Sequence, residues 1–202
     1  MEQMLIPDDG YGNYLLMFAH YNINIFKLLL ENGADINKDG RYGSVLTDYI
    51  YENGDDVSFE YIQFLIDSGA DINYEGNNQY TPLMQAIISG TIYRLELIKF
   101  LLDKGANNFE FYEEDNGYNA IHFAVNIGSS YKNNIENEVY QIVKLLVDAG
   151  ANVNARTSEY SEYSNAGYQD EERGLTPLMF AIQRNHISVV NFLLQNGADI
   201  YI

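Results

Sequence analysis

A seven-residue phrase recurs along the chain and constrains its fold more than any other feature. It reads ENGADIN at residues 31–37, and variants follow as DSGADIN (67–73), DKGANNF (103–109), DAGANVN (148–154) and QNGADIY (195–201). The glycines of successive copies are 36, 36, 45 and 47 residues apart. A period in this range is typical of solenoids, in which each unit buries its apolar face against its neighbours. The sequence therefore predicts a stack of five units.

The last copy predicts the structure of one unit. Thr176 is suited to cap a helix with its hydroxyl, and Pro177 fits the first helical position, where its missing N–H is harmless. Apolar residues then repeat at helical spacing over 178–182, and a second apolar set covers 189–194. Gly197 ends the second helix, because glycine enters the left-handed conformation without steric cost. Each unit is expected to be a helix pair followed by a turn.

The pattern T-P-L-x-x-A … V-V-x-x-L-L-x-x-G-A-D in this copy resembles the ankyrin repeat. The third unit carries Thr81-Pro82-Leu83, and the fourth replaces these residues by Asn119-Ala120-Ile121-His122. The second begins more weakly with Ser44-Val45-Leu46, and the first has Tyr14-Leu15-Leu16 at this place. A degenerate first copy is typical of a terminal capping repeat. The resemblance implies an all-α ankyrin-repeat solenoid of helix-turn-helix pairs, joined by β-turn or hairpin fingers.

One domain, residues 1–202, is expected to hold all five repeats. The resemblance implies that the inner helices and the fingers line a concave face that binds proteins, without a cofactor. The expected repeats span 8–37, 38–73, 74–107, 108–154 and 155–202, with a long finger insertion at 155–174.

The charge of the chain narrows the class of partner. The sequence contains 29 Asp and Glu against 11 Lys and Arg, a formal net charge of −18. Nucleic acids and anionic membranes are bound mainly through Lys and Arg, and no basic stripe is present, so neither is an expected partner. A protein with a basic surface is favoured instead.

Several absences point to the cytoplasm. The sequence has no cysteine, which excludes disulfides and thiolate sites and fits a reducing compartment. The first ten residues have neither a basic nor an apolar segment of a signal peptide, and no stretch approaches 18 consecutive apolar residues. We therefore expect a cytoplasmic protein without a membrane span.

Extra residues distinguish this chain from a regular repeat array. The turns between paired helices are long around 52–58, 89–94 and 128–137, and the fingers vary at 74–80, 107–118 and 155–174. A loop longer than about 12–15 residues inside a domain is usually functional or disordered. Two interpretations stay open for these segments: polar insertions without a role, or a binding surface.

The fingers carry tyrosines among acids, a combination suited to binding. Tyrosine offers a large, stiff contact area, and neighbouring acids attract a basic partner. We therefore expect the partner-binding residues to be Tyr80, Tyr112, Glu113, Glu114, Asp115, Tyr118, Tyr160, Tyr163, Tyr168, Asp170, Glu171 and Glu172.

No pattern in the sequence favours catalysis. His122 and His186 stand where the repeat pattern places structural histidines, His20 stands alone, and no pair has the spacing of metal ligands. The acidic runs lack the order of ligands of a calcium-binding loop. We expect no catalytic residue, no metal and no cofactor, and hence a protein that is not an enzyme.

Two functions remain open. An inhibitor, for example an immunity protein that covers a basic toxin surface, fits the negative charge. An adaptor that bridges two proteins needs a second surface, for which 128–137 is a candidate. The chain ends directly after the last repeat, so we expect a monomer or weak self-association through the outer face of repeat five.

Overall fold

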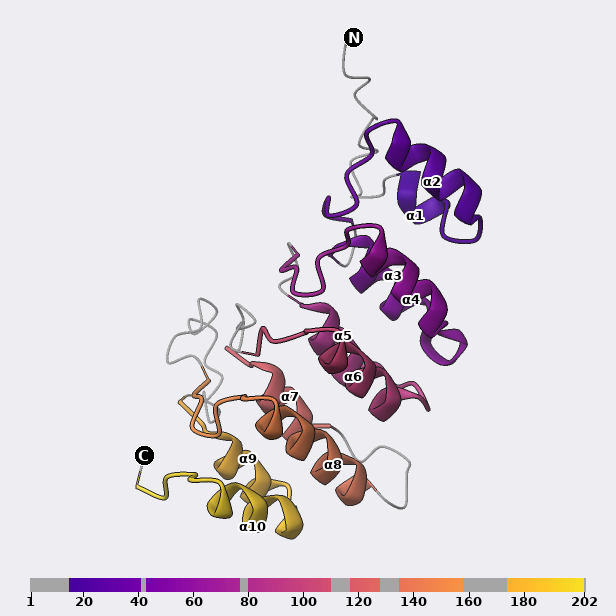
Figure 1. Ribbon diagram of the computed structural model, residues 1–202. Helices are drawn as coiled ribbons and strands as arrows, with labels where there is room; N and C mark the ends of the chain where they lie inside the picture. The colour runs from indigo at the N-terminus through magenta and orange to yellow at the C-terminus, as the bar shows by residue number, and fades with distance from the viewer. Residues whose placement is uncertain are drawn as a thin grey trace, which may run out of the picture.

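The computed structural model describes residues 15–40, 43–76, 80–109, 117–127, 135–157 and 174–201, and these form five stacked helix pairs (Figure 1). Expectations about residues 1–14 and the other gaps fall outside this part. No strand occurs within the described ranges. The pairs are α1 (Leu15–Phe18) with α2 (Ile23–Glu31), α3 (Val45–Asn53) with α4 (Phe59–Asp67), α5 (Pro82–Ile88) with α6 (Arg94–Asp103), α7 (Ala120–Val125) with α8 (Ile135–Asp148), and α9 (Pro177–Gln183) with α10 (Ile187–Gln195).

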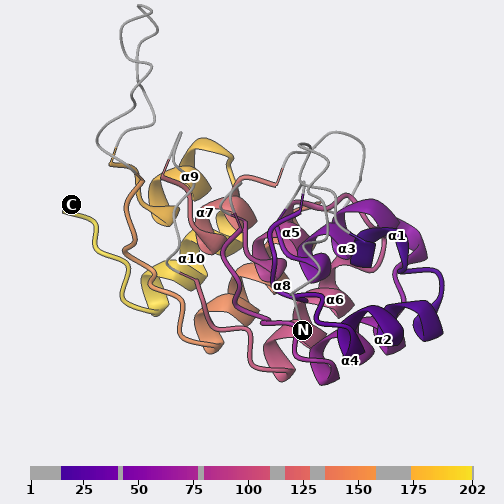
Figure 2. The same ribbon diagram turned by 90° about the horizontal axis from the view of Figure 1, so that it is seen from above.

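The helices form two layers (Figure 2). The inner layer holds α1, α3, α5, α7 and α9, and the outer layer holds α2, α4, α6, α8 and α10. The connections within pairs lie along one edge of the stack, which we call the turn edge and which is on the right in Figure 1. The connections between pairs, the fingers, lie along the opposite edge.

Side-chain caps fix the start of the inner helices α5 and α9. The hydroxyl oxygens of Thr81 and Thr176 accept hydrogen bonds from the amides of Met84 and Met179, at 3.2 and 3.4 Å. A proline follows each threonine at the first helical position, as the sequence predicts. These caps satisfy amides that lack a partner inside the helix.

The recurring glycine ends each outer helix. Gly69 has φ +101°, and the next amide, that of Ala70, bonds to the carbonyl oxygen of Leu65 at 3.0 Å. This closure satisfies a carbonyl at the helix end and turns the chain toward the finger. The glycine of every copy has a positive φ: Gly33, Gly69, Gly105, Gly150 and Gly197.

The core runs continuously between the two layers. Outer helices contribute the residue four positions before each of these glycines, and four of the five, Leu65, Leu101, Leu146 and Leu193, are fully buried. Inner helices face them with Leu46, Leu83 and Ile121, which are also buried. The helical spacing of the apolar residues therefore predicts the core correctly.

The last residue of the recurring phrase ties each repeat to the next. Asn73 donates from Nδ2 to the carbonyl oxygen of Gly105 (3.3 Å), and its Oδ1 accepts from the amides of Asn107 (2.8 Å) and Asn108 (3.2 Å). Asn37 and Asn154 make the equivalent pair of bonds to the following repeat. We call these residues the asparagine clamps. Position 109 carries a phenylalanine instead, and its ring is buried.

Candidate functional site

A row of side chains along the inner layer forms the candidate binding surface. Each lies seven residues after the residue that precedes its inner helix, so the repeat places all of them on the same side of the stack. Tyr51 is 48% exposed and Ile88 39%, while Asn126 is half-buried and Gln183 is exposed. We call Tyr51, Ile88, Asn126 and Gln183 the concave row.

A hollow of about 280 Å³ opens at the centre of this row, between α5 and α7. Ile88 and Asn126 line it together with Phe123, Tyr118 and Arg94. The Oδ1 atom of Asn126 is buried there without a hydrogen-bond partner in the protein. The hollow combines apolar and polar walls, which suits a partner side chain that makes an apolar contact and also forms a hydrogen bond.

Arg94 contributes little free positive charge to the hollow. Its Nε donates to the carbonyl oxygen of Ser89 (2.7 Å), and its Nη1 donates to Glu138 of α8 (2.9 Å). The ion pair joins repeats three and four at the turn edge. The guanidinium is thus committed to the stack rather than to a ligand.

His122 holds the base of the last finger. The amide of Asn119 donates to its Nδ1 (3.3 Å), so Nε2 carries the proton and donates to the carbonyl oxygens of Ala155 and Leu175, both 3.2 Å away. Burial lowers the pKa of His122 to about 4, which keeps the ring neutral. The structural role expected for this histidine is confirmed by these bonds.

Two of the predicted binding tyrosines lie in the described part of the chain. Tyr80 is half-buried, and its ring packs edge-on against Phe123 with centroids 5.7 Å apart. Tyr118 is only 5% exposed and packs against Phe180 (5.3 Å) and Phe123 (5.6 Å). Its ring therefore packs in the core, and it also lines the hollow between α5 and α7, so its expected contact with a partner stays a prediction.

The other ten predicted binding residues fall outside the described ranges. They are Tyr112, Glu113, Glu114, Asp115, Tyr160, Tyr163, Tyr168, Asp170, Glu171 and Glu172.

Latches at the turn edge were not found from the sequence. Asp55 accepts from the amide of Ile92 in the next repeat (2.7 Å). Glu136 accepts from the amide and the hydroxyl of Ser188, at 3.0 and 2.9 Å, and so caps α10 from α8. Both acids lie in or beside the long turns 52–58 and 128–137, which offered the only sequence signal for them.

No arrangement in the described residues suits catalysis or a metal. They contain no group of three His, Asp or Glu residues that could hold an ion. His186 is 7% exposed at the start of α10, and burial lowers its pKa. Among the helices described, none has the length and apolar character needed to cross a bilayer.

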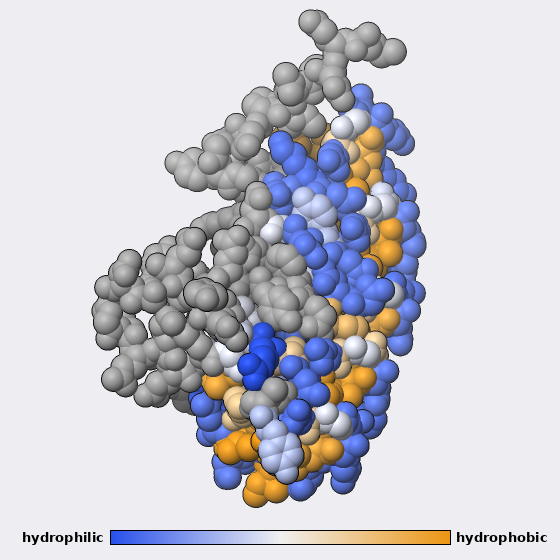
Figure 3. All heavy atoms as spheres, turned by 90° about the vertical axis from the view of Figure 1, so that its left-hand side faces the viewer, coloured by the Kyte–Doolittle hydropathy of each residue, from blue (hydrophilic) through white to orange (hydrophobic). Residues whose placement is uncertain are grey.

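The hydropathy of the finger edge changes from one end of the stack to the other (Figure 3). Hydrophilic residues dominate the upper part, and apolar residues gather at the lower end, which α9 and α10 form. Large apolar side chains exposed in this repeat are Ile182, Ile187, Leu194 and Ile200. Ile182 is 60% exposed, whereas the equivalent Ile87 is fully covered by repeat four.

Comparison with known proteins agrees with this architecture. The family model described as "Ankyrin repeats (3 copies)" matches three overlapping spans, residues 15–110, 52–157 and 112–202. The human protein "2-5A-dependent ribonuclease" is 37% identical over 65 residues, which is 32% of this chain and 7% of that protein. This similarity concerns a small part of a much longer protein. The matched spans, the five helix pairs and the glycine-ended outer helices identify the chain as a member of the ankyrin-repeat family.

Proposed function

We propose that this chain is a non-enzymatic, cytoplasmic protein-binding module whose acidic concave and finger face binds a basic protein and inhibits it. The observation that carries the proposal is the concave row with its central hollow, which pairs an apolar contact at Ile88 with a buried acceptor at Asn126. Ankyrin repeats are protein-interaction modules, and this chain adds a net charge of −18.

Exposed acidic residues beside Tyr51 and at the finger bases support a basic partner. Glu52 is exposed next to Tyr51, and Asp35 and Asp71 are exposed at the bases of the first two fingers. Charges of one sign around a binding face speed the approach of an opposite surface and disfavour a like one. At physiological salt this attraction acts over about 8 Å, so it should depend strongly on ionic strength.

The finger residues complete the proposed contact. Tyr80 borders the hollow through Phe123 and is proposed to extend the concave row toward the fingers. The ten residues beyond the described ranges, Tyr112 to Asp115 and Tyr160 to Glu172, are proposed to add aromatic and acidic contacts. Weak self-association through the exposed apolar residues of repeat five is part of the same proposal.

An adaptor that bridges two proteins is the second candidate. It is favoured by a separate hollow at the turn edge between repeats one and two, which shares no lining residue with the hollow between α5 and α7. A partner held there leaves the concave row open for another.

Capture from native lysate, followed by kinetics with the captured protein, tests the proposal. Ile88→Arg places a bulky cation in the hollow, and Leu28→Arg makes the same charge change on the exposed outer face of α2. We expect basic proteins to be captured by the wild type and by Leu28→Arg and lost by Ile88→Arg, with association slowed by added salt. Equal capture by both variants, or association that ignores salt, would contradict the proposal.

A further inference from the structure

A second hollow, of about 480 Å³, opens at the turn edge between repeats one and two. Four aromatic rings line it: His20 and Tyr21 come from the turn between α1 and α2, Tyr49 from α3 and Tyr61 from α4. We call this hollow the turn-edge pocket. It lies opposite the fingers, at the C-terminal end of α3, and it shares no lining residue with the hollow between α5 and α7.

The rings form a continuous wall. His20 packs on Tyr21 with centroids 3.6 Å apart, and Tyr49 packs on Tyr61 at 4.7 Å. His20 and Tyr49 meet edge-on at 6.5 Å, which joins the two pairs. Aromatic faces attract cations, most strongly where water is partly excluded.

Tyr61 leaves a buried polar atom without a partner in this wall. The residue is 8% exposed, and its hydroxyl oxygen makes no hydrogen bond within the protein. Burial raises the pKa of Tyr61, so the phenol stays neutral. A buried hydroxyl without a partner is costly, and a ligand that supplies the missing bond recovers that cost.

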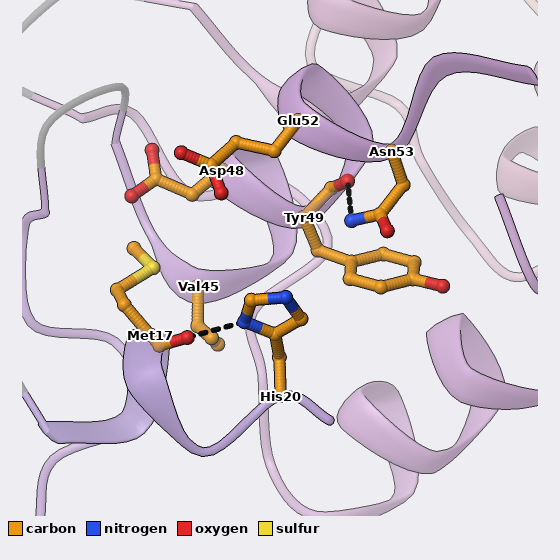
Figure 4. A pocket seen from close by; sticks show the side chains of 7 residues that line it. All are labelled: Met17, His20, Val45, Asp48, Tyr49, Glu52 and Asn53. Carbon is orange, nitrogen blue, oxygen red and sulfur yellow. Dashed lines mark hydrogen bonds between the residues drawn. The ribbon is translucent and has the colours of Figure 1, made fainter. Parts of the chain in front are cut away.

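His20 contributes a second buried polar atom without a hydrogen-bond partner. Its Nδ1 bonds to the carbonyl oxygen of Met17 (Figure 4), which can only accept, so in the neutral ring the proton is on Nδ1 and Nε2 is an acceptor. Nε2 is buried and has no partner in the protein. His20 also lines a smaller hollow, whose lining residues Figure 4 shows, but this hollow measures only about 10 Å³ and so cannot admit a side chain.

The charges around the turn-edge pocket are negative. Asp56 and Glu60 line it and are exposed, and none of its lining residues is Lys or Arg. Hydrogen bonds from its own backbone amide and from the hydroxyl of Ser58 lower the pKa of Glu60, so this carboxylate stays ionised. Aromatic faces, two unused acceptors and carboxylates together select a ligand that is cationic and donates hydrogen bonds.

We propose that the turn-edge pocket binds the ammonium or guanidinium group of a basic side chain from a partner polypeptide. The N–H groups of the cation donate to Tyr61 Oη and His20 Nε2, and its charge is balanced by Asp56 and Glu60. The site shares no lining residue with the hollow of the concave row, so it gives the chain a second contact for a protein.

Titration of the full chain with blocked amino acids, followed by NMR, tests the site. The probe is Nα-acetyl-lysine amide, with the arginine analogue as a second cation and the norleucine analogue as an uncharged control. We expect saturable shifts at the rings of His20 and Tyr61 with both cations and none with norleucine. The trimethyl-lysine analogue keeps the charge but has no N–H on its cationic group, so it should bind several-fold more weakly.

Tyr61→Phe is the decisive variant, because it removes only the hydroxyl without a partner. It should leave stability unchanged or higher while weakening the lysine probe about tenfold, the effect of one lost hydrogen bond to a charged group. Tyr140→Phe, in α8 away from the pocket, is the matched control and should bind as the wild type does. Equal affinity of Tyr61→Phe and wild type, equal affinity for lysine and trimethyl-lysine, or no saturable shift with either cation would each overturn the proposal.

Discussion

His122 donates from Nε2 to the carbonyl oxygen of Leu175, 3.2 Å away, and so joins α7 to a residue 53 positions later in the sequence. The same nitrogen lies 3.2 Å from the carbonyl oxygen of Ala155. One neutral ring therefore holds both residues that flank segment 156–174. Both ends of the fifth finger are therefore held by this histidine, through bonds that need a proton on Nε2 and none on Nδ1.

This dependence predicts a loss of stability in mild acid. The pKa of His122 is about 4 in the folded chain, against an ordinary value of 6.5, so the unfolded chain binds the proton first as the pH falls. The contribution of the neutral His122 ring to the free energy of unfolding is fully present above pH 6.5 and is lost as the pH falls through 4. The difference is about 3 kcal/mol. Urea unfolding of wild type and His122→Gln between pH 7 and pH 4 measures it. Parallel pH dependences in the two proteins would show that the histidine is not responsible.

The asparagine clamps should carry part of the coupling between repeats. Asn73→Ala removes the bonds to Gly105, Asn107 and Asn108, and we expect it to lower the free energy of unfolding by about 1–3 kcal/mol. Amide exchange at residues 107 and 108 should rise as well. Asn191→Ala, on the exposed side of α10, is the control and should cost little. An Asn73→Ala protein as stable as wild type would refute the role of the clamp.

Glycine substitutions separate backbone conformation from packing. Gly105 has φ +100°, yet a Cβ built on it meets no atom within 4 Å, so the cost of Gly105→Ala comes from the backbone alone. We expect a loss of about 1–3 kcal/mol. Gly90 also has open space around it and has no positive φ, so Gly90→Ala should be nearly neutral. Thermal unfolding of both variants gives the comparison, and equal effects would contradict it.

The latch between Glu136 and Ser188 should control local opening of α10. Hydrogen bonds from the amide and the hydroxyl of Ser188 lower the pKa of Glu136. Glu136→Ala should therefore speed hydrogen exchange at the amide of Ser188 more than at other amides of α10. Asn137→Ala, one residue later on the same exposed surface, should leave this amide unchanged. Unaltered protection of Ser188 in Glu136→Ala would mean that the latch has no effect.

Local patterns in the sequence predict the architecture well. The Thr-Pro pairs, the apolar spacing and the five glycines each act within one helix pair, so the caps at Thr81 and Thr176 and the buried Leu65 and Leu101 follow from them. The alternation of Phe109 and Phe111 with polar residues predicts that at least one of the two packs inward, and Phe109 is 6% exposed.

Contacts between repeats are harder to predict, because they depend on the offset of two segments more than thirty residues apart. Within a single repeat, the sequence does not distinguish the clamps at Asn37, Asn73 and Asn154 from ordinary turn residues, or the latches at Asp55 and Glu136 from ordinary polar loop residues. Tyr118 shows that contacts between repeats also make the candidate site hard to predict from the sequence. Its place beside a glycine in a finger favours exposure, whereas the stacking of α7 on α9 buries its ring against Phe180.

Phe109 makes the stability of the junction between repeats three and four depend on temperature differently from that of the other junctions. At this position the other junctions have an asparagine whose two directional bonds reach the next repeat, whereas a phenyl ring can offer only burial. The stabilisation from apolar burial weakens on cooling. The hydrogen bonds of the asparagine clamps do not depend on apolar burial. Near freezing, the finger edge of the junction between the third and fourth units should therefore loosen before that of the other junctions, while the Arg94–Glu138 pair still joins the two units at the turn edge.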